Sequence, residues 1–346
     1  MRIIYGVSGE GFGHSSRAKQ MISHLQKKGH QILVITYGQA YPVLKKQFNT
    51  YKIGGIRLIY DKKGRLSIPN TIADNISPVL KNIKNLGKIT KRAREFSPDI
   101  FITDFEPITA IVSYILQKPL ISIDNQRRLT HLDISVPLKY KKDFLIAKTA
   151  TAINPPRADA YIILSFAKSK PKSKKAFVVS PILRKKITKL RASSLNFILV
   201  YQTKPDKKFI SLLRKIPQKF IVYGYNIKKR EKNIIYKEAG EHFINDLAKA
   251  KAVIASAGFT LMSEALYLKK PYFAIPLKGQ FEQTINAIFL KKAGFGDFSE
   301  NPTKEQIDSF LSSINKCRAR LRQYKTSPHE AMNVMDKLIK KFAKKR

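Results

Sequence analysis

The residues best suited to chemistry follow the apolar run KAVIAS in the C-terminal half. Ala257 and Gly258 predict a sharp turn at the end of a strand, with a helix after it. The backbone amides of Phe259, Thr260 and Leu261 would then point outward from a helix N-terminus. Such an end carries about half a positive charge and suits a pyrophosphate.

Glu264 is the first carboxylate in this predicted helix. It comes six residues after Gly258, about one and a half turns into the helix. A carboxylate there can accept hydrogen bonds from the two hydroxyls of a ribose. A solvated helix glutamate is the alternative that spacing leaves open.

A second loop and helix follow in LKGQFEQTINA. Glu282 and Asn286 are four residues apart, and Gln283 and Asn286 are three apart, so these side chains share a helical face. Carboxylate and amide groups directly after a strand suit the recognition of sugar hydroxyls. Helix capping and surface solvation remain open as the alternative.

A glycine-rich loop, with Gly9, Gly11 and Gly13 before His14, lies between the first predicted strand and helix. It lacks the third glycine of G-x-G-x-x-G, and the next strand ends ITYGQ without an acidic residue, so a nicotinamide dinucleotide is disfavoured. The Gly-Lys-Ser/Thr of a P-loop is also absent. His14 could accept a proton from a substrate hydroxyl, because imidazole titrates near neutral pH. Helix capping is the alternative.

Asp104 and Glu106 provide two further candidate bases. Both follow the apolar strand IFIT, and open α/β sheets bind ligands at the carboxyl ends of their strands. Turn and cap chemistry before Pro107 is the alternative for this pair.

The elements that must position these residues alternate between apolar strands and helices, which predicts parallel sheets covered by helices. The predicted strands of the first half are RIIYGV, QILVITY, DIFITDF, PLISID and AYIILSF. Those of the second half are NFILVYQ, KFIVYGY, NIIYK, KAVIASAG and PYFAIP. The first helix should begin at Ser15 or Ser16 and end at Gly29.

The chain, at 346 residues, is long enough for two domains. We place the boundary at 185/186, after a basic connector. The last helix puts Met332, Met335, Ile339 and Phe342 on one face with lysines opposite. Its apolar face is expected to pack across onto the first domain, with docking on anionic lipid as the alternative.

A formal net charge of +42 implies polyanionic partners, namely anionic lipid, phosphorylated substrate or nucleic acid. A lysine-rich proteome would explain it equally well. A single cysteine, Cys317, excludes an internal disulfide and a thiolate cluster, and the six histidines show no metal-ligand spacing. Neither a signal peptide nor an apolar run of membrane-spanning length is seen, so we expect a cytoplasmic protein.

At these residues the sequence resembles the donor-site block of GT-B-fold glycosyltransferases. It is similar to the lipid II N-acetylglucosaminyltransferase, the glycosyl-diacylglycerol synthases and the UDP-glucuronosyltransferases. Their shared pattern reads here Ala257-Gly258, Ser263, Glu264-Ala265, Pro271 and Glu282-Gln283-x-x-Asn286-Ala287. SGEGFGHSSRA, TDFEP and SIDNQRRLTH resemble segments of a little-characterised microbial branch of this superfamily.

The resemblance implies two Rossmann-like domains facing across a cleft, with residues 1–185 on the acceptor side and 186–346 binding the donor. It implies that Glu264 binds the donor ribose, the amides after Gly258 its diphosphate, and Glu282 with Gln283 the transferred sugar. Glu282 departs from the more usual Asp. Tyr201-Gln202-Thr203 lacks the glycine-rich phosphate loop of some relatives.

The function expected from the resemblance is inverting transfer from a nucleotide sugar, with UDP as the default nucleotide, to a glycan or glycolipid hydroxyl. His14 is the first candidate base, followed by Asp104 and Glu106. No Asp-x-Asp pair occurs, so we expect no metal and no cofactor, the nucleotide sugar being a substrate. Peripheral binding to the inner face of the cell membrane would suit the charge.

Three other classes stay open. A nucleotide-sugar 2-epimerase or hydrolase would use the same fold without an acceptor. A nucleic-acid-binding protein would use the charge, but no recognition helix or aromatic-basic pattern is present, so nucleic acid is not an expected partner. A non-catalytic nucleotide-sugar sensor is the third.

Overall fold

The computed structural model describes residues 1–55, 68–155, 157–167, 169–238 and 240–344. The chain divides into two compact units. Unit 1 comprises residues 1–184 and 327–346, and unit 2 comprises residues 185–326. The terminal helix therefore belongs to unit 1, although the rest of its half of the chain forms unit 2.

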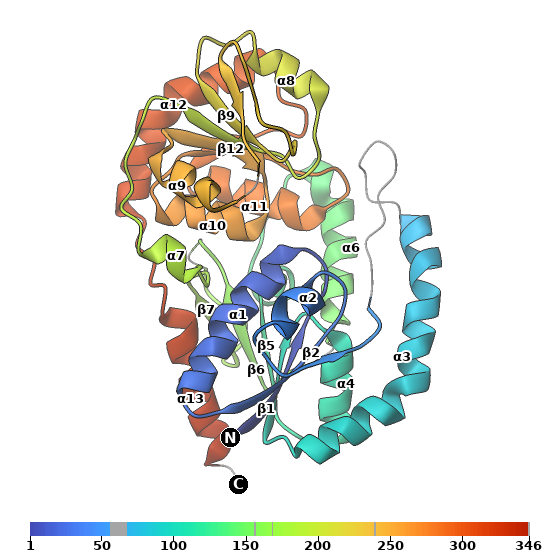
Figure 1. The fold of residues 1–346 in the computed structure, drawn as a ribbon. Coiled ribbons are helices and arrows are strands. Elements are labelled where there is room, and N and C mark those ends of the chain that lie inside the picture. Colours follow the sequence, from blue (N-terminus) through green and yellow to red (C-terminus); the bar gives the residue numbers. More distant parts are fainter. Residues whose placement is uncertain (56–67, 156, 168, 239, 345–346) are drawn as a thin grey trace. The chain divides into compact units, whose positions relative to one another are not determined.

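Unit 1 (Figure 1) is built on a seven-stranded parallel sheet, whose strand order is β3-β2-β1-β4-β5-β6-β7. Its strands are β1 (Arg2–Val7), β2 (Gln31–Thr36), β3 (Thr50–Lys52), β4 (Ile100–Asp104), β5 (Leu120–Asp124), β6 (Ala160–Leu164) and β7 (Ala176–Val179). Its helices are α1 (Phe12–Lys27), α2 (Ala40–Lys45), α3 (Ile68–Phe96), α4 (Pro107–Ile115), α5 (Arg128–His131), η1 (Leu138–Tyr140), α6 (Lys141–Ala152) and α13 (Glu330–Ala343).

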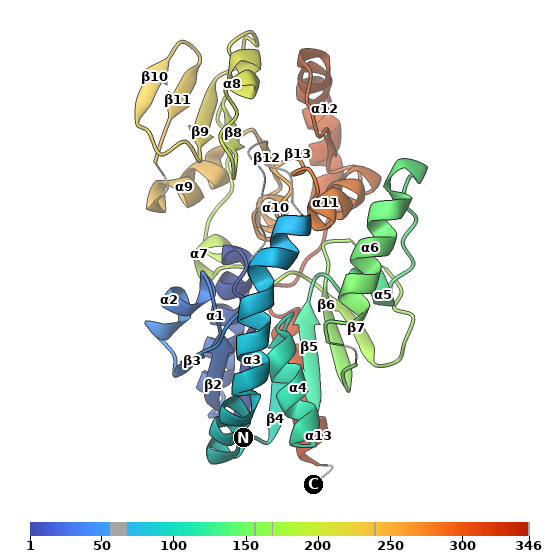
Figure 2. The same cartoon turned by 90° about the vertical axis from the view of Figure 1, so that its right-hand side faces the viewer.

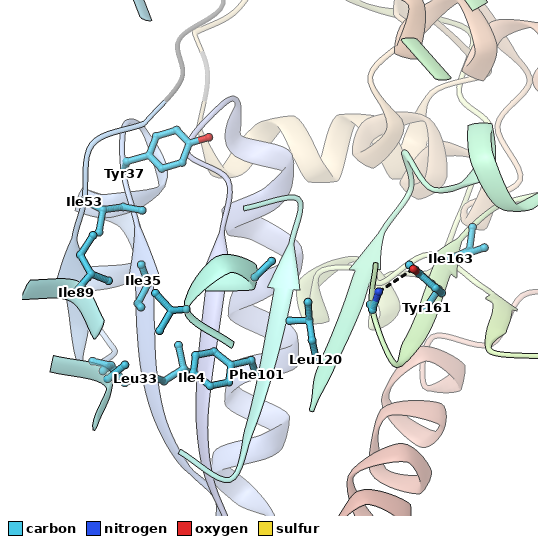
Figure 3. Packing of buried hydrophobic residues seen from close by; sticks show 14 of the residues in the cluster. Ile4, Leu33, Ile35, Tyr37, Ile53, Ile89, Phe101, Leu120, Tyr161 and Ile163 are labelled. Atoms are coloured by element: carbon cyan, nitrogen blue, oxygen red, sulfur yellow. Dashed lines mark hydrogen bonds between the residues drawn. The ribbon is translucent and has the colours of Figure 1, made fainter. Parts of the chain in front are cut away.

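The sheet of unit 1 is buried on both faces, as continuous apolar strands predict. One face packs against α3 and α4, and Figure 3 shows Ile4, Leu33, Ile35 and Phe101 among the side chains of that core. On α1, His24 bonds Asp336 of α13 through Nε2 at 2.9 Å, which joins these two helices. Strand order reverses between β1 and β4, the place where open α/β sheets bind ligands.

The five strands predicted for the first half are present, and short strands β3 and β7 were missed. Helix α1 begins earlier than predicted, because Gly11 rather than a serine is the N-cap and Ser15 donates to the Phe12 carbonyl inside the first turn. Its end is as predicted: Gly29 adopts a φ of 81°, which glycine tolerates best.

Unit 2 also has a seven-stranded sheet, in the order β10-β11-β9-β8-β12-β13-β14 (Figure 2). All its pairs are parallel except β10 with β11. The strands are β8 (Ile198–Tyr201), β9 (Phe220–Tyr223), β10 (Lys229–Glu231), β11 (Ile234–Tyr236), β12 (Ala252–Ser256), β13 (Tyr272–Ile275) and β14 (Gly296–Phe298). The helices are α7 (Lys185–Thr188), α8 (Lys207–Leu213), α9 (Glu241–Lys249), α10 (Phe259–Tyr267), α11 (Phe281–Lys292) and α12 (Lys304–Gln323).

The order of strands in unit 2 reverses between β8 and β12. The turn after β12, with Ala257 and Gly258, therefore lies at a second ligand-binding position of the same kind. The amide of Thr203, just after β8, donates to Ser256 Oγ at 3.2 Å and joins the two strand ends.

Helix α13 uses its apolar face for packing. Met335 and Ile339 are buried, Met332 and Phe342 are half-buried, and the helix contacts β6 and β7. The packing onto the first domain that the sequence predicted is therefore observed. Because this face is covered by the rest of unit 1, it is not available to lipid. Among the described residues, no helix is both long and apolar enough to span a membrane.

Candidate active site

The glycine loop after β1 has little room for side chains. A Cβ on Gly9 would lie 2.4 Å from the Tyr37 ring and from the Tyr37 carbonyl oxygen. Gly11 has a φ of 74°, a conformation that disfavours other residues. Gly13 follows in the first turn of α1. The loop therefore places the first turn of α1 so that His14 lies within reach of the end of β4.

His14 and Asp104 meet at this point. Nδ1 of His14 lies 2.8 Å from Oδ1 of Asp104, and both side chains are buried. With its proton on Nδ1, the imidazole donates to the carboxylate and leaves Nε2 as an acceptor. This is the arrangement of a histidine base oriented by a carboxylate.

Arg17, one turn after His14 on α1, binds the same Asp104 carboxylate, and its Nη2 also lies 2.8 Å from Nδ1 of His14. Its Nε donates to Oδ2 at 2.7 Å and its Nη2 to Oδ1 at 2.5 Å, a two-pronged bond of the strong kind. Its Nη1 donates to Asn125 Oδ1 at 2.8 Å. Arg17 therefore links the ends of β4 and β5 to α1.

The charge of Asp104 is determined by these neighbours. Burial by itself raises the pKa of this carboxyl, but the Arg17 guanidinium and then His14 outweigh burial and hold the pKa below its usual value. Asp104 is therefore ionised at neutral pH, as a histidine partner should be.

Gln126 lies close to the other ring nitrogen of His14. Its Nε2 lies 3.5 Å from Nε2 of His14, at the outer limit of a hydrogen bond. The segment before α5 holds it there: the Arg127 amide donates to Asp124 Oδ1 at 2.7 Å, and Arg127 Nη2 donates to the Pro155 carbonyl at 2.5 Å.

Glu106 occupies a different environment from Asp104. It is the N-cap of α4, and its carboxylate accepts from the amides of Ile108 at 2.9 Å and Thr109 at 2.7 Å, and from the Thr109 hydroxyl at 2.5 Å. Burial raises its pKa against these bonds. The role of a helix cap, which the sequence left open, therefore accounts for the hydrogen bonds of both Glu106 carboxylate oxygens.

In unit 2, Gly258 is the N-cap of α10 and, as a glycine, has no side chain of its own to cap this helix. The predicted turn between β12 and α10 is present, but the φ of Gly258 is −66°, which any residue adopts, so the turn does not depend on the conformational freedom of glycine. A Cβ there would meet no described atom within 4 Å. Beyond Gly258 the helix begins with Phe259 and Thr260, as predicted.

The carboxamides of α11 anchor this turn. Gln283 Oε1 accepts from the amides of Ala257 and Leu277, each at 3.1 Å, and Asn286 Nδ2 donates to the Ala257 carbonyl at 2.9 Å. Gln283 Nε2 in turn donates to Gln280 Oε1 at 2.6 Å. These two side chains thus bind the ends of β12 and β13 to one another.

The two glutamates differ in exposure. Glu264 is fully buried in the second turn of α10, so the alternative of a solvated helix glutamate is wrong. Glu282 is half-buried in the first turn of α11. The roles of Glu264 toward the ribose, and of Glu282 with Gln283 toward the transferred sugar, stay predictions.

Comparison with known proteins assigns the chain to a family. The model of a family described as Glycosyl transferase family 1 matches residues 1–315. The chain belongs to this family.

Relatives of this family 1 glycosyltransferase agree with the assignment. A Methanosarcina acetivorans protein named as a glycosyltransferase is 25% identical, with 89% of this chain and 88% of the relative covered. A Bacillus thuringiensis UDP-N-acetylglucosamine–N-acetylmuramyl-(pentapeptide) pyrophosphoryl-undecaprenol N-acetylglucosamine transferase is 25% identical over 31% of this chain and 34% of its own.

Solved structures show the same fold. The calicheamicin glycosyltransferase CalG4 matches with a TM-score of 0.68 at 13% identity, covering 99% of this chain and 98% of its own. MurG of Acinetobacter baumannii matches with a TM-score of 0.65 at 16% identity, covering 98% and 99%. The fold is therefore GT-B, as predicted.

Three side chains of this glycosyltransferase were not singled out from the sequence. Arg17, Asn125 and Gln126 complete the surroundings of His14 and Asp104, and the last two lie in SIDNQRRLTH, a segment that the sequence marks only by its resemblance to relatives. A signal was available, because Asn125 and Gln126 follow a buried strand at the carboxyl edge of the sheet. Among the described residues no three His, Cys, Asp or Glu side chains gather in a way that could hold a metal ion.

Proposed function

We propose that the protein transfers a sugar, with inversion and without a metal ion, from a UDP-sugar to the hydroxyl of a lipid-linked or cell-envelope glycan. We also propose that it acts in the cytoplasm, at the inner face of the membrane. The observation that carries the chemistry is the buried pair of His14 and Asp104, 2.8 Å apart. The acceptor class is supported by the name of the Bacillus relative, and the membrane by the net charge of +42.

In the proposed reaction the acceptor oxygen attacks the anomeric carbon as Nε2 of His14 takes the hydroxyl proton. The bond from that carbon to the diphosphate oxygen breaks, and its electron pair leaves on UDP. Asp104 stabilises the imidazolium that forms, and Arg17 keeps Asp104 ionised. The N-terminus of α10 faces the charge that develops on the diphosphate, with Glu264 on the ribose and Glu282 on the sugar.

Gly258 offers a sharp test of the donor site. Neither its φ nor packing against described atoms requires a glycine, so Gly258→Ala should leave the melting temperature almost unchanged. If a diphosphate approaches the α10 amides, the added methyl will lower UDP affinity about tenfold or more, as one misplaced contact can.

The matched control is Gly240→Ala. Gly240 is the N-cap of α9, and a Cβ there also meets no described atom within 4 Å. Calorimetry with UDP and a panel of nucleotide sugars compares the two variants with the wild type. Equal UDP affinity in all three would remove α10 as the diphosphate site, and no binding of any nucleotide would overturn the donor proposal.

Acceptor dependence then distinguishes transfer from the alternatives. A transferase releases UDP when an acceptor is present, a hydrolase releases it with water alone, and an epimerase converts the nucleotide sugar into its epimer without net release of UDP. NMR of the product's anomeric proton tests inversion.

A further inference from the structure

The outward face of α6 and of the turn before it exposes an aliphatic surface. Leu138 is 78% exposed, Leu145 63%, Ile146 51% and Ile153 70%. We call these four residues the α6 stripe. Exposed aliphatic side chains are ordinary when scattered, but a group on one element marks an interaction surface.

Helical spacing places the stripe on one side of α6. Leu145 and Ile153 are eight residues apart, or slightly more than two turns, and Ile146 lies next to them. The opposite side of this segment faces the protein, where Tyr140 and Thr151 are buried and α6 packs on α5. The element thus has apolar side chains both toward the protein and away from it.

Lysines accompany the stripe. Lys139, Lys141 and Lys142 are exposed and Lys148 is half-buried, against one exposed carboxylate, Asp143. By helical angle, Lys139 falls on one flank of the stripe, Lys141 and Lys148 on the other, and Lys142 within it. Lys139 Nζ lies 4.7 Å from the centre of the Tyr140 ring, so its stem follows the protein surface.

We propose that this surface docks on an anionic lipid bilayer, with the α6 stripe among the upper acyl carbons and the four lysines at the headgroups. Amphipathic elements that lie in the membrane interface combine aliphatic and lysine side chains in this way. The proposal rests on the proposed function, since it gives a glycosyltransferase with a lipid-linked acceptor its means of reaching that acceptor.

Other partners fit this surface less well. Lysine is depleted in protein interfaces, whereas here it borders every part of the stripe. Single-stranded nucleic acid is bound by exposed aromatic rings and arginines, but the exposed apolar residues here are aliphatic, and no arginine occurs between residues 129 and 156.

Tryptophan fluorescence tests the depth of insertion, because the chain contains no tryptophan. Ile146→Trp is compared with Ile227→Trp, at an exposed isoleucine of unit 2 (43% exposed). With vesicles of 70% phosphatidylcholine and 30% phosphatidylglycerol, the proposal predicts a blue shift and quenching by brominated acyl chains for Ile146→Trp only. Equal behaviour of the two reporters would overturn it.

Charge is tested by vesicle co-sedimentation of two variants of equal net charge. One carries Gln at Lys139, Lys141, Lys142 and Lys148, and the other at the exposed Lys207, Lys208, Lys215 and Lys228 of unit 2. At about 1 kcal/mol per lysine, the first should lose about a hundred- to a thousandfold in vesicle affinity and the second far less. Equal losses would mean diffuse attraction and overturn the site.

Replacing Leu145, Ile146 and Ile153 by Ser should lower vesicle affinity about tenfold or more. Sedimentation velocity without vesicles reveals the competing occupant: self-association that this triple variant abolishes would assign the stripe to a second copy of the chain and overturn the lipid proposal. UDP calorimetry on every variant separates the outcomes, since nucleotide binding tests the proposed function whether or not vesicles bind.

Discussion

The end of β4 is surrounded by ionised side chains, whereas the turn after β12 is held by neutral groups. In unit 1 the buried Asp104 lies between Arg17 and His14, with bonds of 2.5 to 2.8 Å. In unit 2 the corresponding turn is held by the neutral carboxamides of Gln283 and Asn286, with bonds of 2.9 to 3.1 Å. Both lie where strand order reverses.

The difference follows from what each site is proposed to do. A proton acceptor must be an ionisable side chain, and a buried one needs fixed charges around it. A diphosphate already carries its charge and needs only donors, which a helix end provides. We therefore expect changes in unit 1 to act through charge and changes in unit 2 to act through geometry.

The largest expected effect is that of His14→Ala. Loss of the base should lower turnover at saturating substrates by about 100- to 10,000-fold, while UDP affinity changes little. His24→Ala is the matched control, because His24 lies on the same helix but bonds Asp336. Full turnover of His14→Ala would remove the base assignment.

Asp104→Asn tests the expectation that changes in unit 1 act through charge, by way of the free energy of unfolding. Leaving the buried Arg17 without its carboxylate should cost about 3–5 kcal/mol in the free energy of unfolding, measured with urea. The sign of the pH dependence follows from the lowered pKa of Asp104. The stability contributed by the ionised form is fully present above the unfolded pKa and is lost as the pH falls through the lower folded pKa.

The variant should therefore lack part of the acid destabilisation seen in the wild type below about pH 4. If the unfolding free energies of wild type and variant stay parallel from pH 6 down to the onset of acid unfolding, Asp104 does not have the charge state described here.

Sequence patterns predicted the fold of this protein well, since buried parallel strands are continuous apolar runs and the βα alternation fixes their class. The runs RIIYGV and DIFITDF also led to His14 and Asp104, because each of these residues follows or ends such a strand. Short edge strands such as β3 and β14 were missed, since three residues carry too weak a pattern.

Contacts between distant segments could not be predicted in the same way. Arg17 reads as an ordinary helix arginine until β4 and β5 are seen beside it. Gln283 and Asn286 share a helical face as predicted, but only the fold shows that this face meets the backbone of the Ala257 turn. The φ of Gly258 could not be predicted, because a glycine can serve either an unusual φ or free space.

Gln283→Leu tests the expectation that changes in unit 2 act through geometry. It leaves two backbone amides, those of Ala257 and Leu277, without their acceptor, at a cost of about 1–3 kcal/mol in the free energy of unfolding. UDP affinity should fall with it, because the turn before α10 loses its anchor, while the pH dependence of stability stays that of the wild type.

Gln283→Glu separates these two consequences. Its carboxylate can still accept from both amides, so stability should recover, whereas a negative charge near the α10 N-terminus should keep UDP affinity low. Recovery of both quantities, or of neither, would contradict the anchoring role.

The smallest effect concerns Lys270, a buried cation of unit 2 whose Nζ donates to the Ser193 carbonyl rather than to a carboxylate. Burial, and then the charge of Arg318, lowers its pKa to about 8. The unfolded chain, whose lysine titrates near 10.5, therefore binds more protons between pH 8 and 10.5, so this residue makes stability rise with pH in that window. Lys270→Met should remove a rise on the order of 1 kcal/mol, visible in urea titrations at pH 7.5 and 9.5. An identical rise in the variant would mean that Lys270 is solvated in solution. Its charge would then not be a buried counterpart to the paired charges around Asp104 in unit 1.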